Sequence, residues 1–180
     1  MKYSSPFFSL VFLLILTPAV NAQQYSFPED WEGNWQGELK IFSRGKMAQK
    51  VPMTLEISNE QGQRGKFAIT YGAGTEANTR VYSWQLKDSS IGHFVIDEQN
   101  GIFLDAFLVD NCLIERFDIM ESALTGRFCL QDSNLVYEIL STSTKPSWNT
   151  GDTIMGSDTI PPVDSYFIPV LQKARLSREY

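Results

Sequence analysis

The segment CLIERFDIMESALTGRFC, residues 112–129, decides the fold, because it has a cysteine at each end and a turn in the middle. Apolar residues recur at every second position on both sides of the turn, as is typical of strands with one buried face. If the halves pair as a hairpin turning at Met120 and Glu121, Cys112 lies directly opposite Cys129. A longer loop, residues 119–122, gives the same pairing. The segment therefore predicts a cross-strand disulfide on the outer face, with two buried free thiols as the alternative.

The same register gives the hairpin an inner face, on which Leu113 lies opposite Phe128. Tight turns at residues 110–111 and 132–133 extend this register to the neighbouring strands, since Asp, Asn and Ser tolerate the conformations that such turns need. On the outer face, Asp105 is then expected to form an ion pair with Arg116.

One residue on the predicted inner face is charged. Glu115 lies opposite Ala106 on one side and Gly126 on the other, so small side chains surround it. An unpaired carboxylate in an apolar interior costs several kcal/mol. Glu115 is therefore a candidate polar contact for a ligand. The alternatives are a solvated position at the barrel mouth or a bulge that turns Glu115 outward.

Outward from this hairpin, the sequence predicts nine strands with short links and no amphipathic helix among them. Short links between successive strands favour antiparallel neighbours, and a long twisted sheet removes its edges by closing. The sequence therefore predicts an all-β fold, a single up-and-down meander barrel of about eight to ten strands. The predicted strands are 35–43, 49–58, 65–71, 79–87, 91–98, 102–109, 112–119, 123–131 and 134–142.

The chain after residue 142 is rich in Ser, Thr, Gly, Asp and Pro, which is typical of irregular structure. We expect residues 143–180 to form an extension packed on the barrel, with Trp148 and Ile154 pinning it there. Residues 165–178 are expected to form either a short helix or a frayed tail.

The start of the chain resembles a secretory signal. Lys2 precedes an apolar run at residues 6–20, and Val20 and Ala22 occupy the small-residue positions of a cleavage site. We expect residues 1–22 to be a signal peptide, residues 23–142 the barrel, and the protein to be periplasmic or extracellular, with no stable membrane insertion after cleavage. The alternative is an uncleaved anchor, for which the run is short.

Charge and motifs exclude several functions. The net charge is −6, without a large basic cluster, which argues against nucleic acid and anionic membranes as partners. The G-x-S-x-G, H-E-x-x-H and P-loop patterns are absent, and no metal or cofactor is expected. The single histidine, His93, points outward if the turn at residues 99–101 has three residues. It points inward, where it would bind a metal or serve a catalytic barrel, if the turn has two. We expect no enzyme activity.

A family resemblance begins at Gly33-Asn34-Trp35. A G-x-W on the first strand of a meander barrel resembles the lipocalins and the wider calycin group, and the order of features is similar to that of small exported bacterial lipocalin-like domains. The resemblance implies that Trp35 packs across one end of the barrel, under an Arg from a late strand. Arg116 and Arg127 are the candidates, and the register points both outward.

The resemblance also implies that the barrel binds a small apolar molecule. The candidate polar anchor is Glu115. The candidate lining residues are Trp35, Tyr82, Trp84, Phe117, Phe128 and Tyr137. The alternative function is a structural or protein-interaction module with a filled barrel, in which the extension plugs the mouth or docks a partner.

Overall fold

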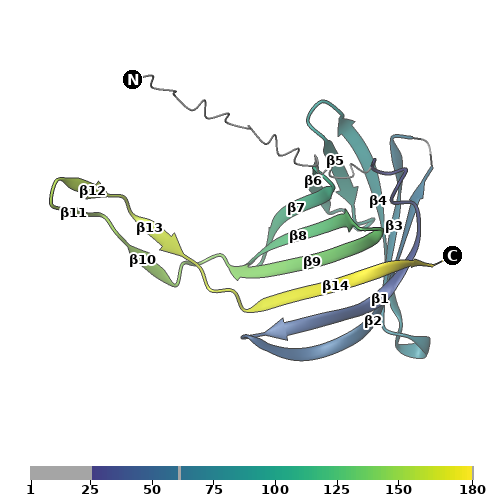
Figure 1. The fold of residues 1–180 in the computed structure, drawn as a ribbon, viewed down its shortest axis with the longest axis horizontal. Coiled ribbons are helices and arrows are strands. Elements are labelled where there is room, and N and C mark those ends of the chain that lie inside the picture. Colours follow the sequence, from purple (N-terminus) through teal and green to yellow (C-terminus); the bar gives the residue numbers. More distant parts are fainter. Residues whose placement is uncertain (1–25, 61, 180) are drawn as a thin grey trace, which may run out of the picture.

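The computed structural model describes residues 26–60 and 62–179. Within these residues, ten strands form a closed barrel in which each strand is antiparallel to both neighbours (Figure 1). The predicted all-β meander barrel is therefore confirmed. Nine strands follow one another in sequence: β1 (Gly33–Ser43), β2 (Lys46–Asn59), β3 (Arg64–Tyr71), β4 (Asn78–Asp88), β5 (His93–Asp97), β6 (Phe103–Val109), β7 (Cys112–Ile119), β8 (Ser122–Gln131) and β9 (Asn134–Ser143). A single 3-10 turn, η1 (Gly74–Glu76), precedes β4.

The tenth barrel strand is β14 (Val170–Glu179), which lies between β9 and β1 and closes the barrel. The expected helix or frayed tail over residues 165–178 is therefore wrong. Ala174 and Leu176 are buried, whereas Lys173, Arg175 and Ser177 between them are exposed, which is the period of a strand. Without β14, the edges of β1 and β9 would lack hydrogen-bond partners, and this pairing outweighs the local helical pattern.

Residues 144–169 form an arm that projects from the barrel (Figure 1). In it, β10 (Trp148–Thr150) pairs with β13 (Val163–Ser165), and β11 (Thr153–Met155) pairs with β12 (Asp158–Ile160). Trp148 is 70% exposed and Ile154 is 73% exposed, so the expectation that they pin this segment to the barrel is wrong. These four short strands pair within the arm, and backbone hydrogen bonds to the barrel are made at its base, by Thr144, Phe167 and Pro169.

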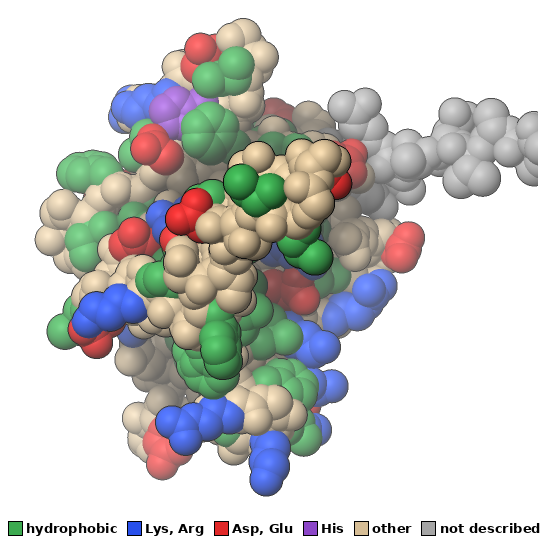
Figure 2. All heavy atoms as spheres, turned by 90° about the vertical axis from the view of Figure 1, so that its left-hand side faces the viewer, with side chains coloured by type: hydrophobic (Ala, Val, Ile, Leu, Met, Phe, Trp, Pro, Cys, Tyr) green, Lys and Arg blue, Asp and Glu red, His purple; other side chains and the backbone are tan. Residues whose placement is uncertain are grey.

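Figure 2 views the molecule from the side on which the arm projects, and it shows hydrophobic side chains of this face open to solvent. The base of the arm is fastened to the barrel at Glu121, in the turn between β7 and β8. The Thr144 amide donates to the Glu121 carbonyl over 3.1 Å, and the Lys145 Nζ lies 2.8 Å from the Glu121 Oε1. The arm therefore leaves the barrel where β9 ends and β14 begins.

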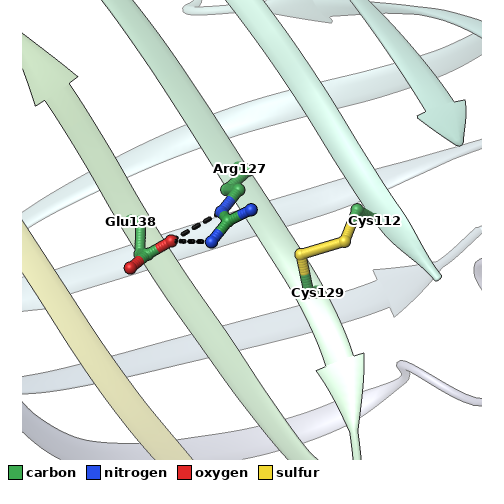
Figure 3. The surroundings of a disulfide bond; sticks show 4 residues. All are labelled: Cys112, Arg127, Cys129 and Glu138. Atoms are coloured by element: carbon green, nitrogen blue, oxygen red, sulfur yellow. Dashed lines mark hydrogen bonds and ion pairs between the residues drawn. A yellow bond between two sulfur atoms is a disulfide. The ribbon is translucent and has the colours of Figure 1, made fainter.

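The disulfide is confirmed. Cys112 on β7 pairs with Cys129 on β8, and their Cα atoms lie 4.1 Å apart (Figure 3). Beside it, Arg127 forms an ion pair with Glu138 on β9, on the outer surface (Figure 3). The expected pair of Asp105 with Arg116 is wrong, because Asp105 binds His93 and Arg116 lies 2.9 Å from Asp118.

One end of the barrel is closed by tryptophans. Trp35 is only 1% exposed, and its indole Nε1 donates to the Trp31 carbonyl over 2.9 Å. Arg178 of β14 covers the Trp35 ring, with its guanidinium carbon 4.6 Å from the ring centroid, and donates to the Asp30 carbonyl. The residue that covers Trp35 is therefore Arg178. Arg116 and Arg127, the candidates named from the sequence, lie on the outer face.

Residues 1–22, the predicted signal peptide, lie outside the described residues. In the part of the chain that is described, no helix is long and apolar enough to cross a membrane.

Candidate functional site

A cavity of about 620 Å³ lies inside the barrel above the tryptophan floor. Most of its wall is apolar, with Val51, Ile69, Leu124 and Ile139 among the residues that line it. Ile102 and Ile119 also line the cavity, yet they are 42% and 50% exposed. Ile119 ends β7 and Ile102 directly precedes β6, both at the end of the barrel away from Trp35, so the cavity opens at the end opposite the floor.

Five of the seven candidate site residues line this cavity. They are Tyr82, Glu115, Phe117, Phe128 and Tyr137. The register places the four on β7, β8 and β9 there, because these strands pair as the tight turns predict, with Leu113 opposite Phe128 and Phe128 opposite Tyr137. The ring of Phe128 also stacks on that of Phe67, with centroids 5.8 Å apart.

Trp35 and Trp84 lie below the cavity in the packed floor, and neither belongs to its lining. Trp84 is 1% exposed and packs against Phe27, whose ring centroid lies 5.2 Å away. Gly65 makes room for the indole, since a Cβ at that position would lie 2.5 Å from Cζ2 of Trp84. The segment that precedes β1 thus fills the closed end, and Trp31, fully buried there, is part of the floor.

Five polar residues of the cavity wall are absent from the candidate set: Tyr71, Arg80, Glu98, Asp118 and Gln172. Strand alternation places Tyr71 on the inner face with Phe67 and Ile69, and that signal was available in the sequence. Arg80 lies on the inner face of β4 with Tyr82. In the sequence, a charged residue at that position is typical of the end of a strand, so it did not indicate an inner-face residue. Gln172 faces inward only because residues 170–179 form a barrel strand.

The hydroxyl groups of Tyr71 and Tyr137 form a hydrogen bond across the cavity, with their oxygens 3.1 Å apart. Burial raises the pKa of both phenols above the usual value. At the rim, Arg80 forms a hydrogen bond with Tyr82, which raises the pKa of the guanidinium. The two tyrosines are therefore neutral donors and acceptors, and Arg80 stays charged.

Glu115 points into the cavity, as the register predicts, and Ala106 and Gly126 are its pairing partners. A Cβ at Gly126 would lie 2.7 Å from the Glu115 Oε1, so the missing side chain provides the space for the carboxyl group. Burial, with a smaller repulsion from Glu98, raises the pKa of Glu115 from 4.5 to about 7. Near neutral pH, this carboxyl therefore changes between a hydrogen-bond donor and an anion.

His93 lies on the outer face, as the three-residue turn predicts, and its side chain is 24% exposed. Its ring stacks on Phe107 with centroids 4.8 Å apart, and its Nε2 lies 2.8 Å from Oδ1 of Asp105. The inward alternative, which a catalytic or metal site on His93 requires, is therefore wrong. Among the described residues, no group of three or more His, Cys, Asp or Glu side chains could hold a metal ion.

No family model matches the sequence, and no curated protein is detectably similar to it. Among solved structures, the S-type phycobiliprotein lyase CPES from Guillardia theta superposes with a TM-score of 0.57 at 8% identity, over 84% of this chain and 90% of that chain. A protein of unknown function from the DUF3598 family, from Nostoc punctiforme, superposes with a TM-score of 0.59 at 13% identity, over 92% of this chain and 53% of that chain. At these identities the similarity shows the fold alone, which is a closed antiparallel β-barrel.

Proposed function

We propose that this protein binds a small, largely apolar molecule inside its barrel, with entry from the end opposite Trp35. The observation that carries the proposal is the cavity of about 620 Å³, which lies within the size range of ligand sites. Its wall combines many apolar side chains with a few polar groups, an arrangement that excludes water from the ligand and fixes its orientation.

We propose a binding role without catalysis. The CPES neighbour is a lyase by name, so the main alternative to a binding role is an enzyme built on this fold. Histidine is the residue that most often transfers protons near neutral pH, and here His93 lies outside the cavity. This placement supports binding over acid-base chemistry.

A role in protein interaction is the second candidate, and the arm is the observation that favours it. Residues 144–169 expose large apolar side chains, among them Trp148, Ile154 and Phe167. The cavity excludes the version of this candidate in which the barrel is filled, and the arm projects instead of plugging the mouth. The arm could act beside a ligand site, because it contributes no residue to the cavity wall.

We also propose that the protein is exported to the periplasm or beyond. The signal-like pattern of residues 1–22 supports this, as does the Cys112–Cys129 disulfide, since such bonds persist in oxidising compartments. Intact-mass spectrometry of the natural protein should find a chain that begins at Gln23 and has an oxidised cysteine pair. A reduced, cytosolic chain that begins at Met1 would contradict export.

Fluorescence titration with the neutral dye N-phenyl-1-naphthylamine tests the binding proposal. Ile139 lines the cavity, so Ile139→Trp should fill it and reduce dye affinity at least about tenfold. Thr125→Trp on β8 is the matched control, because Thr125 is exposed and points outward. Equal dye affinity in both variants, or no dye binding by the wild-type protein, would count against an internal site.

A further inference from the structure

The cavity wall holds a carboxyl group without a partner. Across the described residues, no hydrogen bond or ion pair reaches the Glu115 carboxyl, although Glu115 lies well inside the barrel. We propose that the natural ligand is an apolar molecule bearing a protonated amine, which Glu115 binds. This inference rests on the proposed binding function and specifies the ligand's chemistry.

The barrel is built to admit this carboxyl group. Glu115 faces inward on β7, and its partners on β6 and β8 are Ala106 and Gly126. A side chain at position 126 would contact both the Oε1 atom, at 2.7 Å, and the Cγ atom, at 3.0 Å. The small residues on both sides thus make room for the carboxyl group, and Glu115 lines the cavity.

In the part of the chain that the structure describes, no positively charged side chain pairs with Glu115. Among the described residues, Arg80 is the one positively charged side chain on the cavity wall, and it is exposed at the rim, where it binds Tyr82. The charged residue that most affects Glu115 is another acid, Glu98, which also lines the cavity. The missing positive charge is therefore one that a ligand can supply.

The chemistry of the wall favours an amine over the other common head groups. An ammonium group donates up to three hydrogen bonds and forms charge-assisted bonds with a carboxylate, which are stronger than neutral ones. Phe117, Phe128 and Tyr137 line the same cavity, and the faces of aromatic rings attract cations. A fatty-acid carboxylate would instead meet Glu98 and Glu115, and like charges at close range repel.

Three competitors with the same ten-carbon chain separate these head groups: decylamine, 1-decanol and decanoic acid, each displacing N-phenyl-1-naphthylamine at pH 8. Decylamine should displace the dye at a concentration about tenfold lower than decanol, and decanoate should be the weakest. In Glu115→Gln, the decylamine concentration that displaces the dye should lie within about twofold of the decanol concentration that does so, and the decanol concentration should be the same as in the wild-type protein. Glu56→Gln is the control, because Glu56 is exposed on β2 and its loss alters the net charge equally.

Each outcome decides between the proposals. Displacement by decanol without any preference for decylamine would overturn the amine inference and leave the proposed function standing. A decylamine preference that persists in Glu115→Gln would assign it to another group and overturn the role of Glu115. Failure of the dye and of all three competitors to bind would overturn the proposed function itself. The comparison in the wild-type protein needs no variant, so poor folding of Glu115→Gln would not prevent the test.

Discussion

The carboxyl group of Glu115 is the residue-scale feature on which the ligand site depends. Its inward position could be predicted from the sequence, because two-residue turns fix the pairing of β6, β7, β8 and β9. The elevated pKa of Glu115 could not be predicted, because it depends on burial in the closed barrel and on Glu98, which comes from a separate loop. A lone acid among inward-facing apolar residues therefore indicates the position of a polar contact, and the closed barrel determines its charge.

Glu115 should make stability depend on pH. The pKa of Glu115 is about 7 in the folded protein and 4.5 as an ordinary value, so unfolding releases a proton between these pH values. Stability should therefore fall as pH rises from about 4.5 to 7, by on the order of 3 kcal/mol in total. Glu115→Gln should unfold at higher urea than the wild-type protein at pH 8 and at similar urea at pH 4. An equal difference at both pH values would contradict a buried, protonated Glu115.

Arg178 is expected to stabilise the closed end. Its guanidinium covers Trp35 and donates to the Asp30 carbonyl, so Arg178→Ala should lower the free energy of unfolding by about 1–2 kcal/mol. Arg178→Lys should recover part of this loss, because it keeps the charge and loses the planar group. Urea unfolding followed by tryptophan fluorescence measures both variants. An alanine variant as stable as the wild-type protein would show that the contact is incidental.

At the scale of the elements, local pairing could be predicted and long-range pairing could not. The nine strands from β1 to β9 and the Cys112–Cys129 bond follow from alternation and tight turns, which act over a few residues. The tenth barrel strand, β14, pairs with β1. For example, the Ser177 hydroxyl donates to the Gln36 carbonyl, which lies 141 positions earlier in the sequence. No local pattern specifies such a partner, and so the Arg178 contact could not be predicted either.

Closure by β14 leads to a prediction about truncation. A chain that stops after residue 169 loses Ala174 and Leu176 from the core and exposes the edges of β1 and β9. Exposed edges pair with other molecules, so the truncated protein should aggregate or fail to fold. Size-exclusion chromatography with circular dichroism measures this. A monomeric truncated protein with an unchanged spectrum would contradict the role of β14.

At the scale of the whole molecule, a hollow barrel carries a projecting arm near its open end (Figures 1 and 2). The strands of each part pair among themselves, and backbone hydrogen bonds between the two parts join Thr144 to Glu121, Ser143 to Phe167 and Arg44 to Pro169. Composition did indicate a change at residue 143, but the low hydrophobicity of this segment resembles that of a surface loop. The arm has its own fold because turns within it allow β10 to pair with β13 and β11 to pair with β12.

The arm should be dispensable for the barrel. Trp148 pairs with Ser165, so residues 149–164 can be replaced by Asn-Gly, which forms a two-residue turn. This variant should keep the wild-type melting temperature within about 2 °C and the wild-type affinity for N-phenyl-1-naphthylamine. It complements the truncation after residue 169, which keeps the arm and removes β14 instead. A large loss of dye affinity would show that the arm helps to form the site.

The central claim is that a small apolar molecule binds inside the barrel, and methyl NMR during a titration with N-phenyl-1-naphthylamine tests it most directly. The claim predicts saturable shifts for the methyl groups of cavity-lining residues such as Ile69, Leu124 and Ile139, from the ring currents of the dye. It predicts no shifts for Ile154 and Val163 on the exposed arm. Shifts confined to the arm, with the cavity methyl groups unchanged at saturation, would contradict it.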